Sequence, residues 1–72
     1  MTDQERHVHA QVTHAGTHSR DAMLRVAAGK KVNKQTIASL ENRGWITHDD
    51  YTSIQLTEDG VVALRIIQEE YR

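Results

Sequence analysis

The chain has no cysteine and no proline, and only three of its 72 residues are aromatic. Without cysteine it has no disulfide, no thiolate metal ligand and no cysteine nucleophile, which suits a reducing compartment. Without proline, its helices can run uninterrupted. No apolar run approaches the roughly 20 residues that span a bilayer, and the first ten residues contain no apolar signal core. We therefore expect a soluble, cytoplasmic protein that does not enter a membrane.

The chain is also short, so we expect a single domain over residues 1–72. A chain of this size buries only roughly 60% of its unfolded surface and leaves little room for an enclosed substrate pocket. It has no glycine-rich loop to hold a phosphate and no pair of carboxylates on an expected cleft wall. We therefore expect no enzymatic activity and no cofactor.

The N-terminal segment, residues 1–18, carries the signals of one helix. Thr2 and Glu5 have the spacing of a capping box, and Gly16 is a helix terminator. They predict a helix over about residues 3–15. Its apolar stripe is narrow, so we expect this helix to be weakly held and to fray.

Two more helices are delimited by capping residues. Ser19 as N-cap and Gly29 as the residue after the last turn predict a core helix from Arg20 to Ala28. After a short link, Asn33 as N-cap and Gly44 as terminator predict a helix over residues 33–43.

The second half of the chain predicts a hairpin and a last helix. Residues 45–48 and 53–56 are rich in β-formers and flank a polar tip, residues 49–52. Thr57 then caps a helix whose apolar residues cover more than one face, which predicts two packing partners. The predicted fold class is α+β, mostly α, with a minimal sheet.

The run from Thr36 to Ile46, TIASLENRGWI, is followed after the hairpin by LTEDG from Leu56 to Gly60. Together they resemble the winged helix-turn-helix superfamily, in particular MarR-like proteins and small phage or plasmid regulators, over about residues 19–64. The resemblance implies a recognition helix at residues 33–43, a β-hairpin wing and a C-terminal helix. It also implies a regulator of transcription that binds double-stranded DNA and is encoded by a phage or mobile element.

The recognition helix suits DNA chemically. Steps of 100° per residue place Gln35, Ser39 and Asn42 opposite the core-facing Ile37. Glutamine and asparagine can pair with adenine, and alanine can touch a thymine methyl group. Lysines near the helix start are suited to phosphate. The predicted DNA-binding residues are Lys30, Lys31, Asn33, Lys34, Gln35, Ala38, Ser39, Asn42 and Arg43.

Charge is unevenly distributed although the formal net charge is only −1. Residues 20–43 hold six basic and two acidic side chains, whereas residues 44–72 hold six acidic and two basic ones. The acidic hairpin tip would repel phosphate, which favours an alternative: a winged-helix module that binds a host or partner protein. The predicted protein-binding residues are Asp49, Asp50, Tyr51, Val62, Ile66 and Tyr71.

The two-sided last helix also suggests a homodimer, which could read two half-sites of DNA about one turn apart. Five histidines raise the question of a metal site. They are scattered, and the one pair at helical spacing is separated by Gly16, so we expect no metal. These histidines are His7, His9, His14, His18 and His48.

Overall fold

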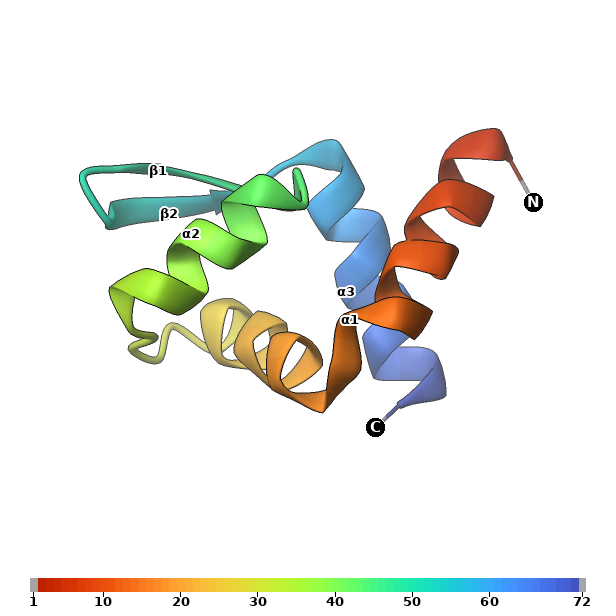
Figure 1. Cartoon of the computed structure of the whole chain (residues 1–72), viewed down its shortest axis with the longest axis horizontal. Coiled ribbons are helices and arrows are strands. Elements are labelled where there is room, and N and C mark those ends of the chain that lie inside the picture. Colours follow the sequence, from red (N-terminus) through yellow and green to blue (C-terminus); the bar gives the residue numbers. More distant parts are fainter. Residues whose placement is uncertain (1, 72) are drawn as a thin grey trace.

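A computed structural model describes residues 2–71, and it is mostly helical with one antiparallel hairpin (Figure 1). The α+β, mostly α class predicted from the sequence is confirmed. Arg72, which was counted in the acidic segment, lies outside the described residues. The elements are α1 (Asp3–Ala27), α2 (Lys34–Asn42), β1 (Ile46–Asp49), β2 (Thr52–Leu56) and α3 (Glu58–Glu70).

Helix α1 begins at the predicted capping box and bends at Gly16. The Thr2 hydroxyl accepts from the Glu5 N–H at 3.1 Å, and the Glu5 carboxylate accepts from Thr2. Gly16 has φ of 83° and ψ of 167°, outside helical geometry, and it divides α1 into two segments. Across the bend, the Val12 carbonyl accepts from Arg20 Nη1 at 3.0 Å. The predicted break at Gly16 is thus confirmed.

The predicted start of the second segment is wrong. Helical geometry resumes directly after Gly16, so Ser19 lies inside the helix and is buried rather than acting as an N-cap. A left-handed glycine redirects the chain within one residue, and no separate cap is then needed. The segment ends as predicted. Gly29 has φ of 73°, and the N–H groups of Gly29 and Lys30 donate to the carbonyls of Val26 and Arg25.

Helix α2 also has the predicted ends. The Asn33 side-chain oxygen accepts from the Thr36 N–H at 2.7 Å. At the other end Gly44 has φ of 81°, and the N–H groups of Gly44 and Trp45 donate to Glu41 and Leu40. This is a Schellman motif, and it turns the chain directly into β1.

Strands β1 and β2 form a tight hairpin. Ile46 pairs with Leu56 and Asp49 with Thr52, so the turn consists of Asp50 and Tyr51 alone. Both turn residues have positive φ, 51° and 66°, as a two-residue hairpin turn requires. A bulge follows in β2, where the register shifts between Thr47 and Asp49.

Helix α3 packs against the N-terminal segment of α1 (Figure 1). Val8 and Val12 of α1 are fully buried, so the segment expected to fray is held in the core. Polar pairs support the contact, among them Gln4 Nε2 to Asp59 Oδ1 at 2.8 Å. The buried apolar residues are Val8, Val12, Ala22, Met23, Ile37, Leu40, Trp45, Ile46, Ala63, Ile66 and Ile67.

The molecule is elongated, with principal extents of 34 × 21 × 18 Å. The hairpin tip and the start of α2 lie at one end, and the first turns of α1 lie at the other (Figure 1). Within residues 2–71, none of the helices has the length and apolar character needed to cross a membrane.

Candidate nucleic-acid interface

Helix α2 has one buried face and one open face. Ile37 and Leu40 are buried in the core, whereas Gln35 and Asn42 are exposed. Lys34 is exposed as well. The structure therefore places the predicted polar side chains where a ligand could reach them. The two remaining positions of that face, Ala38 and Ser39, are half-buried.

The two ends of the predicted set are engaged within the molecule. The Asn33 side-chain oxygen caps α2, although the side chain itself remains exposed. Arg43 is half-buried, and its guanidinium carbon lies 5.6 Å from the centre of the Trp45 ring. Its Nε is buried without a hydrogen-bond partner. Arg43 is thus less available to a ligand than the lysines.

The basic residues gather at the start of α2. Lys30 and Lys31 are exposed in the link between α1 and α2, and Lys34 follows in the first turn. Within residues 2–71 none of these three lysines lies within ion-pair distance of a carboxylate. In the same range, the N–H groups of Lys34 and Gln35 find no acceptor. Free helix amides and free cations together favour an anion at this end.

A hollow of about 580 Å³ lies between this basic end of α2 and the hairpin tip. Its floor contains apolar side chains, among them Val32, Ile37 and Ile54. Tyr51 forms part of the opposite wall, and Lys34 Nζ lies 5.3 Å from the centre of its ring. The hairpin therefore stands beside α2 and shares a surface with it.

The hairpin tip is acidic and open. Asp49 and Asp50 are exposed, and within residues 2–71 neither forms an ion pair. Tyr51 is 37% exposed. Behind the tip, His48 Nδ1 accepts from the Tyr51 N–H at 3.0 Å, and the two rings stack with centroids 4.9 Å apart. The tip is thus fixed by a side chain that sequence reasoning did not single out for this role.

The predicted protein-binding residues of α3 are only partly available. Ile66 is 7% exposed and belongs to the core, so its assignment to an interface is wrong. Val62 is half-buried against the core. Tyr71 is 41% exposed, with the Arg20 guanidinium 4.2 Å from its ring centre. The more open apolar side chain is Val61, at 56% exposure, which sequence reasoning placed in the helix but not at an interface.

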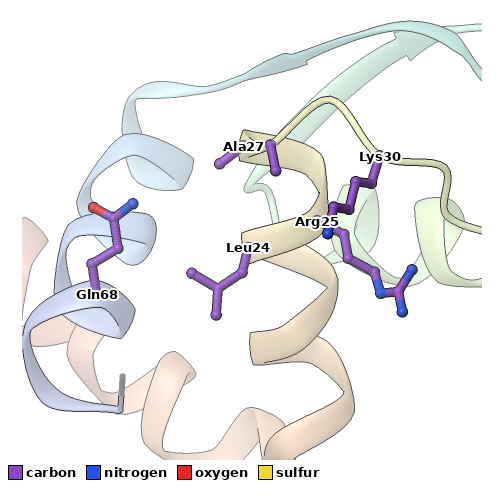
Figure 2. A pocket seen from close by; sticks show the side chains of 6 residues that line it. Leu24, Arg25, Ala27, Lys30 and Gln68 are labelled. Atoms are coloured by element: carbon purple, nitrogen blue, oxygen red, sulfur yellow. The ribbon is translucent and has the colours of Figure 1, made fainter.

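A second hollow of about 390 Å³ lies between the end of α1 and α3 (Figure 2). Leu24 and Ala27 face Gln68 across it, and Arg25 and Lys30 extend along the far side of α1 (Figure 2). It holds one amide and two cations but no carboxylate, histidine or hydroxyl group. Its lining is therefore mainly apolar and cationic.

Three of the histidines form separate polar contacts, each with a different side chain. His9 pairs with Glu70 at 3.0 Å, and His18 lies 3.2 Å from the Thr36 hydroxyl. His48 pairs with Glu41. In the part of the chain that the structure describes, no three histidine or carboxylate side chains lie close enough together to hold a metal ion.

Gln11 is a half-buried side chain whose structural contacts its local sequence does not reveal. Its Oε1 accepts from the Trp45 indole at 3.1 Å, and its Nε2 donates to the Arg43 carbonyl at 3.1 Å. It therefore ties α1 to the end of α2. A polar residue in a helix carries no signal for such a contact, because the partners are more than 30 residues away in sequence.

No protein-family model, no curated protein and no solved structure matches the chain. The functional argument therefore rests on the residues and their geometry.

Proposed function

We propose that the chain is a winged-helix protein that binds double-stranded DNA, with α2 in the major groove and the hairpin as the wing. One observation carries the proposal: the exposed face of α2 presents amide and cationic side chains, while its opposite face is anchored in the core. An α-helix is about 10–12 Å across with its side chains, which fits the major groove.

Each part of the basic end has a role in the proposal. Lys30, Lys31 and Lys34 contact phosphates, and the free amides at the start of α2 add to this attraction. Gln35 and Asn42 read base edges, because an amide can accept from and donate to the same adenine. Phosphate contacts set the position of the helix, and base contacts set the sequence preference.

The experiment is a salt titration of binding to duplex DNA, measured by fluorescence anisotropy. Lys31→Ala and Lys34→Ala are expected to weaken binding almost equally for all sequences, and each should reduce the salt slope by about one. Gln35→Ala should instead change the preference among sequences. Arg6→Ala is the matched control, since Arg6 is an exposed cation in α1, whose first turns lie at the other end of the molecule (Figure 1).

The control should leave affinity and slope unchanged. If the intact protein shows no duplex binding at low salt, or if Arg6→Ala reduces the slope as much as Lys34→Ala does, the proposed role of α2 is wrong.

The wider setting follows from the same proposal. A single 72-residue module offers a limited interface to DNA, so a regulator of this kind acts as a dimer on two half-sites, in the cytoplasm of its host. The exposed Val61 on α3 is the position at which a second copy would pack. Sedimentation equilibrium of the protein alone and of Val61→Glu measures this directly.

A second candidate function is favoured by the acidic tip. Asp49, Asp50 and Tyr51 are exposed together on a hairpin, and acidic side chains there oppose contact with phosphate. In this alternative the winged helix binds a host or partner protein through the tip. The charge variants described in the Discussion separate the two functions.

A further inference from the structure

His48 occupies a position that no predicted role explains. It lies in β1, only 12% of its side chain is accessible, and it contacts the turn on one side and α2 on the other. Its Nδ1 accepts a hydrogen bond from the Tyr51 N–H at 3.0 Å. An amide N–H always donates, so Nδ1 must carry no proton in this arrangement. The neutral ring therefore holds its hydrogen on Nε2.

The Nε2 side of the ring faces an acid. Nε2 lies 3.2 Å from Glu41 Oε2, but it is buried and has no hydrogen-bond partner. The carboxylate is therefore close in distance and out of line with the N–H.

A second proton on the ring cannot coexist with the observed contact. It would bind to Nδ1 and point at the Tyr51 N–H, so that two donors would face each other. We propose that His48 is a pH-sensitive latch that holds the hairpin tip closed when its ring is neutral and releases the tip when the ring is protonated. The latch is independent of what the chain binds.

The surroundings show what the release would move. Tyr51 stacks on His48 at an interplanar angle of 16°, and Lys34 Nζ lies 5.3 Å from the centre of the Tyr51 ring. The hydrogen bond and the stack thus connect the tip to His48, and the Thr52 hydroxyl also donates to the Asp49 carbonyl within the turn. When they are lost, the Tyr51 wall of the 580 Å³ hollow moves away from the basic end of α2.

The charged and titratable side chains nearest to His48 belong to α2, to β1 and to the turn after β1. Strand β2 contributes none, because it contains only Thr, Ser, Ile, Gln and Leu. Helix α2 and the hairpin contribute Lys34, Glu41, Asp49, Asp50 and Tyr51. Of these, Glu41 lies within ion-pair distance of the His48 ring, with its Oε2 3.2 Å from Nε2. The donor–donor conflict at Nδ1 decides its direction, because it arises only in the protonated state.

The test is an NMR titration of the full chain from pH 8 to pH 5. This range lies on both sides of the ordinary pKa of histidine side chains, roughly 6.5. At pH 8 the His48 ring should carry its hydrogen on Nε2, with nuclear Overhauser contacts between the His48 and Tyr51 rings. At pH 5 these contacts should be lost, and protection of the Tyr51 amide against exchange should fall at least ten-fold. The amide signals of α1 and α3 should stay unchanged, which shows that the fold persists.

Three variants complete the test. His48→Asn places an oxygen near the Nδ1 position and does not titrate, so its tip should stay closed at both pH values. His48→Gln reaches toward the Nε2 position and offers no acceptor to Tyr51, so its tip should be open at both. His14→Asn removes an exposed histidine of α1 and should titrate as the wild type does.

Two outcomes would overturn the latch. One is a ring contact and a protected Tyr51 amide that persist after His48 has become doubly protonated. The other is an His48→Asn variant that opens at pH 5 in the same way as the wild type.

Discussion

Gly60 lies where the start of α3 meets the backbone of Trp45. A Cβ atom placed on Gly60 would approach the Trp45 carbonyl oxygen to 1.8 Å and its carbonyl carbon to 2.8 Å. The same carbonyl accepts from the Thr57 N–H at 3.0 Å, and the Thr57 hydroxyl accepts from the Gly60 N–H. Backbone therefore packs on backbone, and no side-chain movement can make room. The close approach of the two backbones therefore explains why a glycine ends the LTEDG segment.

Gly60→Ala is expected to destabilise the protein by about 2 kcal/mol. The overpacking cost of roughly 3 kcal/mol is partly offset by the higher helix propensity of alanine, about 1 kcal/mol. Thermal unfolding followed by circular dichroism should show a melting temperature lower by about 8–16 °C.

Gln68→Ala is the control for this substitution, because Gln68 is in the same helix and exposed. It should change stability by less than about 0.5 kcal/mol. A Gly60→Ala variant that melts with the wild type would contradict the close approach of the two backbones.

At the scale of the element, the first turn of α1 is an electrostatic unit. A hydrogen bond from the Thr2 backbone lowers the pKa of the Glu5 carboxyl below its ordinary value of 4.5. Partial desolvation opposes this shift, while the Thr2 hydroxyl and the Arg65 guanidinium lower the pKa further. The Arg65 contact, at 3.3 Å, also ties this turn to α3.

This lowered pKa gives a pH dependence with a definite sign. Because the folded pKa lies below the unfolded one, the charged Glu5 stabilises the fold at pH values above 4.5, and this contribution is lost as the pH falls through the folded pKa. Glu5→Gln keeps a capping oxygen and removes the charge. It should unfold in less urea than the wild type at pH 7, with the difference closing in acid.

Glu69→Gln is the matched control, since Glu69 is exposed in the last turn of α3. There a negative charge opposes the helix dipole, so its removal should not destabilise the protein at pH 7. If both variants lose the same stability at pH 7, the special role of the capping box is disproved.

Element ends were predictable because their signals are local. Asn33, Gly29 and Gly44 act at the ends of helices through bonds to residues within five positions. Ser19 was misassigned for the converse reason, because a residue that can cap a helix can equally be buried inside one. The contacts of Gln11 could not be predicted, since they depend on how α1 crosses the end of α2.

The candidate site was likewise predictable only in part. The exposed face of α2 follows from helical periodicity once Ile37 is taken as the core position. The hollow beside α2 and the contact of Lys34 with Tyr51 could not be predicted from periodicity, because they depend on how the hairpin lies against α2. Ile66 shows the limit of composition alone, because the second apolar face of a helix can pack against the core of the same molecule instead of a partner.

At the scale of the whole molecule, some acidic side chains are held by contacts within the fold. Asp59 accepts from Gln4, and Glu70 pairs with His9, so the N-terminal segment of α1 covers acids of α3. The tip acids Asp49 and Asp50 have no such partner within residues 2–71. These two tip acids lie at the same end of the molecule as the exposed lysines of the link and of α2.

This arrangement separates the two candidate functions. If the basic end binds DNA, the double variant Asp49→Asn and Asp50→Asn should raise duplex affinity about two- to five-fold at low salt, because like-charge repulsion is removed. The gain should shrink as salt rises. Anisotropy titrations at two salt concentrations measure both effects.

Glu58→Gln serves as the control, because it removes an exposed acid from the first turn of α3 instead of the tip. A double tip variant with unchanged or weaker duplex binding would place the tip away from DNA and favour its use toward a protein.

The two-residue turn has a consequence for anyone who wishes to engineer this protein. Asp50 and Tyr51 both hold a left-handed backbone, which costs an ordinary residue roughly 1 kcal/mol or more, and Asn-Gly would adopt it with less strain. That exchange should make the hairpin more rigid and the protein more heat-resistant. It would also delete the aromatic ring that contacts both His48 and Lys34, so selection for thermostability alone would remove the contact of the turn with these two side chains.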